Sequence, residues 1–209
     1  MTPLQGALRR DTELRPTIRA RGRTGRAQKA AGAAGTLYTI GHSTRDTAEL
    51  LELLRAHGVE QVVDVRTIPR SRHNPQFNGD RLSRSLGQAG ILYVHLKTLG
   101  GLRHARPDSV NLGWRNASFR GFADYMQTET FAAGLRRLEV LAARRPTAIM
   151  CAEAVPWRCH RSLLADALTV ANWRVFHIQS RKTAVPHRCT PFLVVRSARL
   201  LYPGRKGSV

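Results

Sequence analysis

The residue types best suited to chemistry gather in one short segment, CAEAVPWRCHR, between Cys151 and Arg161. An apolar run ends at Cys151 and a helical pattern begins near Cys159, so the segment is expected to join a strand to a helix. The N-terminus of a helix has unpaired N–H groups and a partial positive charge, which attract anions and lower the pKa of a nearby thiol. The segment therefore predicts an anion-binding site, a reactive cysteine or both.

Each side chain of this segment has a candidate role. Cys151 is a candidate nucleophile or polar anchor, and His160 is a candidate acid or base beside it. Glu153 could hold a proton, orient His160 or pair with an arginine, while Arg158 and Arg161 could bind an anion. The alternative is structural, because free cysteines are most often small buried residues of the core.

A metal site is a further interpretation of the same segment. Zinc binds cysteine and histidine side chains, and Cys151, Cys159 and His160, with His177 as an additional candidate, are of these types. The spacing matches none of the short zinc signatures, and adjacent ligands at 159 and 160 are awkward for one tetrahedral ion. We therefore expect no metal and no cofactor, and keep the metal-binding domain as an alternative.

A second candidate site lies at Asp64 and Arg66, in the sequence DVR. Alternation along a strand places both side chains on one face, near the end of a predicted strand. Asp64 could act as a general base or as a hydrogen-bond anchor, and Arg66 could bind an anion through two parallel hydrogen bonds. A structural ion pair between the two residues explains the pattern equally well.

Five further polar residues follow predicted strands or lie in loops. His42 and Ser43 come in a turn after the first strand, Ser71 lies in the loop after the second, and His95 ends the third. Arg103 follows a pair of glycines in a long insertion that could act as a lid. We consider all five as candidate anion-binding residues, with structural or solvated loop roles as the alternative.

The elements that must position these residues alternate regularly. Strands are predicted at 37–40, 59–65, 91–96, 147–151 and 174–178, with a sixth, edge strand at 191–196, and helices at 46–57, 80–89, 119–144 and 159–170. This order predicts a three-layer α/β fold with a mainly parallel sheet and helices on both faces. Functional sites in such sheets lie beyond the carboxyl ends of the strands, so the candidate residues are expected to lie close together at that edge of the sheet.

The charge of the chain favours polyanionic partners. Lys and Arg number 34 against 14 Asp and Glu, which gives a net charge of +20. A nucleic acid or an anionic small molecule such as a nucleotide is therefore an expected partner. The alternative is a solvated basic surface that attracts polyanions only weakly. No apolar run is long enough to cross a membrane, no secretory signal is recognisable, and three irregularly spaced cysteines indicate no disulfide framework, so we expect a cytoplasmic protein without a membrane partner.

Composition also divides the chain. Residues 1–35 are rich in Arg, Ala and Gly and lack hydrophobic periodicity, so they are expected to form a disordered basic tail. An organelle transit peptide is an alternative for this Arg-rich leader. Residues 36–200 are expected to form one α/β domain, and residues 201–209 a C-terminal tail.

Several motifs together resemble the family known as domain of unknown function 488. They are TIGHS at 39–43, DVR at 64–66, the loop with Pro69, Ser71 and Phe77, LYVHLKTLGG at 92–101, CAE at 151–153, CHR at 159–161 and VFHI at 175–178. The motifs keep their order over about residues 36–195. The resemblance implies a three-layer α/β domain and brings no particular reaction with it.

The layout is also similar to that of rhodanese and cysteine-phosphatase domains, in which a strand ending in cysteine leads through an anion-binding loop into a helix. Here the loop is longer and Arg158 comes one residue late, so the likeness is one of layout. The first hypothesis is an anion-binding and catalytic site at the carboxyl ends of the strands that acts on a phosphate-bearing substrate such as a nucleotide or a nucleic acid. The alternative is a non-catalytic nucleic-acid-binding module in which the same arginines hold phosphates.

Overall fold

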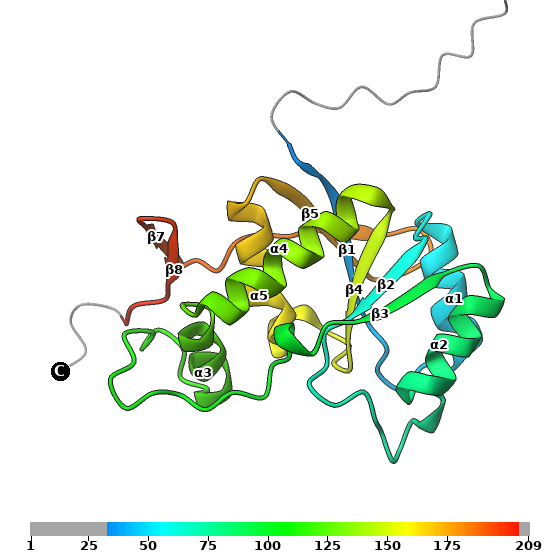
Figure 1. Cartoon of the computed structure of the whole chain (residues 1–209), viewed down its shortest axis with the longest axis horizontal. Coiled ribbons are helices and arrows are strands. Elements are labelled where there is room, and N and C mark those ends of the chain that lie inside the picture. The colour runs from blue at the N-terminus through cyan, green and yellow to red at the C-terminus, as the bar shows by residue number, and fades with distance from the viewer. Residues whose placement is uncertain (1–32, 205–209) are drawn as a thin grey trace, which may run out of the picture.

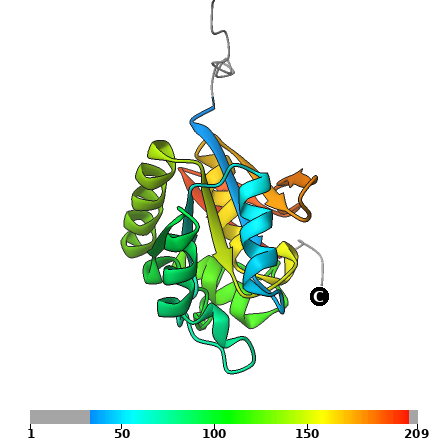
Figure 2. The same cartoon turned by 90° about the vertical axis from the view of Figure 1, so that its right-hand side faces the viewer.

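The computed structural model describes residues 33–204, so the predicted basic tail lies almost wholly outside the described residues. Six strands form one sheet in the order β3-β2-β4-β1-β5-β6. Their bounds are β1 Gly35–Gly41, β2 Gln61–Asp64, β3 Leu92–His95, β4 Thr147–Cys151, β5 Trp173–Ile178 and β6 Ala184–Pro186. The first five strands pair in parallel and β6 pairs antiparallel with β5. Figure 2 shows β1 and β4 side by side within the sheet.

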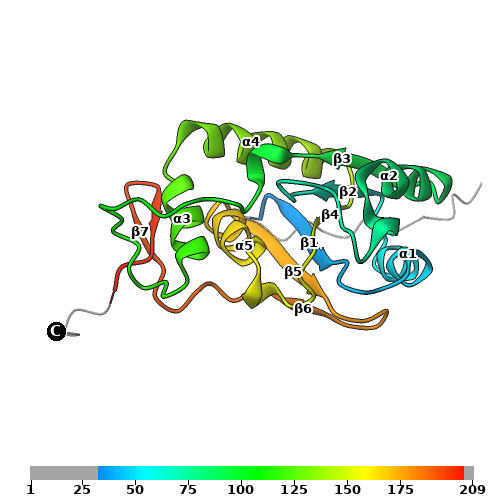
Figure 3. The same cartoon turned by 90° about the horizontal axis from the view of Figure 1, so that it is seen from below.

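Helices cover both faces of this sheet, as predicted (Figures 1 and 3). Helices α1 (Thr47–Ala56) and α2 (Gly79–Gln88) pack on one face, and α4 (Glu129–Arg144) and α5 (Arg161–Val170) on the other. Helix α3 (Ala117–Tyr125) lies beyond the sheet, next to α4 in the chain. Three short 3-10 helices complete the elements near the sheet: η1 Pro75–Phe77, η2 Lys97–Leu99 and η3 Pro156–Arg158.

Local sequence signals explain the first helix and its limits. The carboxylate of Asp46 accepts a hydrogen bond of 2.7 Å from the backbone N–H of Glu49, which caps the N-terminus of α1. Leucines spaced for one face are buried against the sheet, and Gly58, with φ of 64°, follows the end of the helix. The short connection to β2 then brings the chain back to the sheet, which fixes where Asp64 emerges.

Helix α5 is buried over most of its length, from Arg161 to Leu168. One side packs on the sheet, and the C-terminal segment of the chain contacts another, because Tyr202 is fully buried and bonds to Asp166 of α5. This enclosure accounts for a helix with apolar residues on more than one face. It also holds the loop before α5 in a fixed position relative to β4.

Two details at the C-terminal end differ from the sequence-based expectations. The sixth strand of the sheet is β6, because a tight turn at residues 179–183 returns the chain directly to the edge of β5. The segment predicted as that strand contributes instead to a separate hairpin of β7 (Val194–Arg196) and β8 (Arg199–Leu201). The expected tail begins within this packed segment, and its last residues, 205–209, lie outside the described residues. None of the helices in residues 33–204 combines the length and the apolar character needed to cross a membrane.

Candidate functional site

The carboxyl ends of β1, β2 and β4 open onto a cleft with a volume of about 800 Å³. The cleft lies where the alternation of strands and helices placed the candidate residues. Seven of the predicted site residues line it: His42, Ser43, Arg66, Ser71, Cys151, Glu153 and His160. Four others, Asp64, His95, Arg103 and Arg161, do not line it.

Cys151, Cys159 and His160 form a compact cluster in the wall of the cleft. Nδ1 of His160 lies 3.9 Å from Sγ of Cys151 and 3.7 Å from Sγ of Cys159. Nε2 of the same ring lies 3.2 Å from the carbonyl oxygen of Val65, which can only accept a hydrogen bond. Nε2 therefore holds the ring proton, and the lone pair of Nδ1 is directed toward the two buried sulfur atoms.

The two thiols have pKa values that move in opposite directions. A hydrogen bond from Cys159 lowers the pKa of Cys151, as does the ring of His160 when its Nδ1 has taken up the thiol proton, while burial opposes both effects. Burial and the neighbouring Cys151 raise the pKa of Cys159. When the pair loses one proton, Cys151 is therefore the thiol that becomes a thiolate. A thiolate in this position can attack an electrophile or bind a metal ion.

Two glycines let the chain approach this cluster closely. A Cβ atom at Gly101 would lie 2.3 Å from Nδ1 of His160, and a Cβ atom at Gly41 would lie 1.7 Å from the carbonyl oxygen of Glu153. Any side chain at these positions would displace the imidazole or the loop after β4. Of the glycine pair that the sequence suggested as part of a lid, Gly101 packs directly against His160, whereas Gly100 packs against Thr67.

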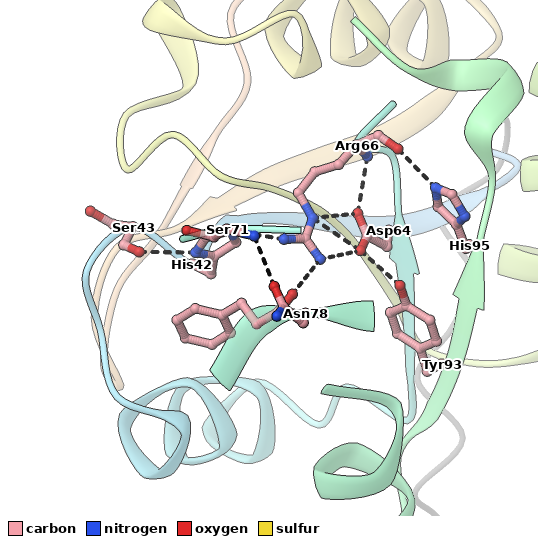
Figure 4. A network of polar contacts seen from close by, with 9 residues as sticks. His42, Ser43, Asp64, Arg66, Ser71, Asn78, Tyr93 and His95 are labelled. Atoms are coloured by element: carbon pink, nitrogen blue, oxygen red, sulfur yellow. Dashed lines mark hydrogen bonds and ion pairs between the residues drawn. The ribbon is translucent and has the colours of Figure 1, made fainter. Parts of the chain in front are cut away.

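Asp64 and Arg66 form a buried ion pair behind the cleft (Figure 4). Nε of Arg66 lies 2.9 Å from Oδ1 of Asp64, and Nη2 lies 2.5 Å from Oδ2. The hydroxyl of Tyr93 donates to Oδ2 at 2.8 Å, and Nη2 also donates to the carbonyl oxygen of Phe77. Although burial opposes it, the hydrogen bonds and charge of Asp64 raise the pKa of Arg66. These contacts favour the structural interpretation of the pair.

His42 connects this ion pair to the first strand. Its Nδ1 lies 2.9 Å from the carbonyl oxygen of Ser43, and its Nε2 accepts from Nη1 of Arg66 at 3.2 Å. The ring stacks on Phe77, with 4.3 Å between centroids. Burial and the charge of Arg66 lower the pKa of His42. Among the described residues, one N–H group of the Arg66 guanidinium is left without a partner.

The start of α5 differs from the anion-binding helix terminus that the sequence suggested. Arg161 is 1% exposed, and its guanidinium donates to the carbonyl oxygens of Glu153 at 2.6 Å and Ala154 at 2.8 Å. The backbone N–H of Arg161 donates to Sγ of Cys159, and the next two N–H groups of the helix donate to carbonyls of residues 159 and 160. Arg161 thus fixes the loop of residues 153–154, and the donors of the first turn are already engaged.

The remaining candidates lie at other positions. Nε2 of His95 donates to the carbonyl oxygen of Arg66 at 2.8 Å, so His95 supports the turn after β2. Arg103 lies over the ring of Tyr125, 3.6 Å from its centroid. Ser71 does line the cleft, and its hydroxyl accepts from the backbone N–H of Asn74.

Two exposed arginines supply the cleft with available charge. Arg70 and Arg158 both line the cleft and make no ion pair with any residue of the described chain, 33–204. Sequence reasoning proposed Arg158 but missed Arg70, whose only signal was its place in the loop after β2. It also missed the side of the cleft formed by Asn116, Ser118 and Phe119, which come from the region before and within α3.

A second histidine cluster lies between β5 and α5, away from the cleft. His177 Nδ1 lies 2.7 Å from Oγ1 of Thr39, and His177 Nε2 lies 3.0 Å from Nδ1 of His187. Nε2 of His187 donates to Oδ1 of Asp166 at 2.8 Å. Burial and the neighbouring His187 lower the pKa of His177 to about 4. With Cys189, Asp166 and His187 form a second group of metal-ligand types, but both carboxylate oxygens already accept hydrogen bonds.

Comparison with known proteins identifies the family. No match is found among curated proteins or among solved structures. The sequence profile described as Domain of unknown function DUF488 matches residues 46–168, which run from the N-cap of α1 into α5 and include Cys151, His160 and the Asp64–Arg66 pair. This match spans more than half of the chain, so the protein belongs to the DUF488 family.

Proposed function

We propose that the protein is an enzyme that acts on a phosphate-bearing substrate, such as a nucleotide or a nucleic acid, in the cleft. The observation that carries this proposal is the cluster of Cys151, Cys159 and His160 in the wall of a cleft that also exposes unpaired arginines. A reactive group and an anion-binding group then face the same ligand.

The charge and size of the cleft support this class of substrate. Arg70 and Arg158 are free to bind a phosphate group, for which the guanidinium geometry is well suited. Only one acidic residue, Glu153, lines the cleft among the described residues, and the whole chain has a net charge of +20. The volume of about 800 Å³ lies in the range of small-molecule sites and accommodates a nucleotide.

Separate roles follow for the groups in the cleft. Cys151 and His160 belong to the reacting centre, with Glu153 as a carboxylate able to accept and return a proton. Arg158 and Arg70 bind the anion, and Ser43, whose φ of 50° is unusual for a non-glycine residue, lines the same space. Arg66, Asp64 and Arg161 hold the backbone of the site in place.

Ligand binding and turnover test this proposal separately. Calorimetry with adenosine monophosphate, inorganic phosphate and a short single-stranded oligonucleotide should show binding that weakens about tenfold in Arg158→Ala and in Arg70→Ala. Arg174→Ala is the matched control, because Arg174 is exposed at the start of β5, at the opposite end of the sheet. Products of incubation with nucleotides and oligonucleotides are followed by mass spectrometry, and Cys151→Ser should abolish their formation.

Two outcomes contradict the proposal in different ways. If Arg158→Ala and Arg70→Ala bind as Arg174→Ala does, the ligand does not occupy the cleft. If oligonucleotides bind with a clear salt dependence but no product forms, the protein is a non-catalytic nucleic-acid-binding module. That second function has less support, because it gives no role to the cluster of Cys151, Cys159 and His160 in the wall of the cleft.

A further inference from the structure

We infer that Cys151, Cys159 and His160 bind a zinc ion whose fourth position faces the cleft. The ligand atoms of these three residues lie within 4.8 Å of one another. Zinc–sulfur bonds of about 2.3 Å and zinc–nitrogen bonds of about 2.0 Å in a tetrahedron require sulfur–nitrogen separations of about 3.5 Å. The observed separations of 3.9 and 3.7 Å exceed this value by a few tenths of an ångström.

The histidine ring is oriented as a metal ligand. Its Nε2–H donates to the carbonyl oxygen of Val65, which fixes the tautomer and leaves the lone pair of Nδ1 directed toward both sulfur atoms. Histidines that bind a metal through one ring nitrogen almost always donate a hydrogen bond from the N–H of the other. A cysteine–histidine dyad alone would need one sulfur atom near the ring, whereas here two are present.

The backbone explains how adjacent residues can serve as ligands. Cys159 is extended, with φ of −133° and ψ of 142°, and His160 is helical, with φ of −55° and ψ of −17°. The change of conformation between them lets both side chains face the same point. The backbone N–H of Arg161 also donates to Sγ of Cys159, as is suitable for a thiolate. Cys159 and His160 can therefore bind the same tetrahedral ion although they are adjacent in the chain.

Charge and ligand chemistry favour zinc. Two thiolates buried together without a cation would be strongly destabilised, whereas two thiolates and a neutral imidazole neutralise a divalent zinc ion. Thiolate and imidazole in a tetrahedral arrangement are the preferred donors of zinc. Three protein ligands with an open fourth position are typical of catalytic rather than structural zinc.

This inference deepens the proposed function and rests on it for the presence of a substrate in the cleft. Glu153 lies two residues after Cys151 and lines the same cleft. In zinc deaminases a glutamate near the ligands takes a proton from the zinc-bound water. Here the water would transfer a proton to Glu153, its oxygen would form a bond to an electrophilic atom of the substrate, and the leaving group would depart with that proton.

Metal content and cobalt spectroscopy test the site without any activity assay. The full-length protein, purified without chelator, should contain one zinc ion per chain, and Co²⁺ exchanged into it should show tetrahedral d–d bands with thiolate charge transfer. Cys159→Ser and His160→Ala should each weaken zinc binding by at least the roughly 10- to 100-fold that loss of a residue supporting a ligand costs. Cys189→Ser is the control and should bind zinc as the natural sequence does, because Cys189 belongs to the second cluster.

Two results would overturn the inference. One is a protein that holds no zinc and binds neither zinc nor cobalt at Cys151. The other is Cys159→Ser with unchanged zinc affinity. If a variant does not fold, the cobalt spectrum of the natural sequence still decides the question. If the protein binds no zinc but binds nucleotides in a way that depends on Arg158, the zinc site is refuted and the proposed function is not. If the protein binds zinc but no ligand binds in the cleft, the proposed function is refuted and the zinc site is not.

Discussion

Two histidine clusters in this protein contain similar groups but differ in how fully their hydrogen bonds are satisfied. In the cluster between β5 and α5, both carboxylate oxygens of Asp166 accept hydrogen bonds, from His187, Thr190 and Tyr202. In the cleft cluster, the two sulfur atoms at 3.9 and 3.7 Å are the only hydrogen-bond partners of His160 Nδ1 among residues 33–204, and sulfur is a weak partner. The first cluster is closed by its own chain, whereas the second is open to a ligand.

The comparison separates stability from function. The closed cluster joins α5 to the C-terminal segment and to β1, so substitutions in it should lower the free energy of unfolding. The open cluster is held by the contact of Gly101 with His160 and by the hydrogen bond from His160 to the carbonyl oxygen of Val65. Substitutions in this cluster should therefore weaken ligand binding more than stability.

Asp166→Ala should lower the free energy of unfolding by about 3–5 kcal/mol, because it leaves several buried donors without an acceptor. Urea denaturation measures the change. Asp80→Ala is the matched control, since Asp80 is exposed in the first turn of α2 and its loss should cost less than about 1 kcal/mol. Equal losses in the two variants would show that the closed cluster stabilises the protein no more than an exposed carboxylate does.

The closed cluster should also make stability depend on pH. The pKa of His177 falls from 6.5 to about 4 on folding, so the unfolded chain binds the proton more readily. The stabilisation is fully present above pH 6.5 and is lost as the pH falls from 6.5 toward 4, by about 2–3 kcal/mol. Denaturation curves at several pH values should show this slope, and His177→Gln should flatten it. An unchanged slope in the variant would assign the effect to other groups.

Gly101→Ala should cost about 1–2 kcal/mol of stability and disturb the open cluster, because the added Cβ would meet the imidazole of His160. Gly87→Ala in α2 is the matched control, since a Cβ there would meet no atom within 4 Å and alanine favours helix. Thermal denaturation and zinc affinity are measured on both. Unaltered zinc affinity in Gly101→Ala would contradict the tight packing of this loop on His160.

Arg103→Ala should have the smallest effect, about 0.5–1 kcal/mol, through loss of its contact with the ring of Tyr125. Because Arg103 does not line the cleft, calorimetric affinity for adenosine monophosphate should stay unchanged. Arg158→Ala, measured in parallel, should lose affinity without losing stability. A drop in affinity for adenosine monophosphate in Arg103→Ala would show that the ligand contacts the long insertion that contains Arg103, outside the cleft.

Much of the fold could be predicted because its signals are local. Leucines at helical spacing before Gly58 define α1, and the apolar run before Asp64 defines a buried strand. The sixth strand could not be predicted in this way. Residues Ala184–Pro186 form a strand of only three residues that contains proline, whereas FLVV has the stronger strand propensity but lies in a separate hairpin segment.

The sequence could predict that candidate residues meet at one cleft, but not which of their arginines are free of contacts within the chain. The strand-end rule brought Ser43, Cys151 and Glu153 to one cleft, as the structure has them. Whether an arginine is available depends on carbonyl groups distant in the chain, such as those of Phe77 and Glu153, which occupy Arg66 and Arg161. Sequence spacing does not encode such contacts. The sequence alone therefore cannot distinguish Arg70, which makes no ion pair in the described chain, from Arg66, which is bound to Asp64 and Phe77.

The central claim is that the cleft beside Cys151 and His160 is where this protein binds its ligand. Titration of the ¹⁵N-labelled full-length protein with adenosine monophosphate, followed by NMR, tests it most directly. The account predicts that amide shifts concentrate at Ser43, Ala152, Glu153 and Arg158, and that they weaken in Arg158→Ala. Shifts gathered on another basic surface, such as the exposed arginines of α4, or no shifts at any soluble concentration, would contradict it.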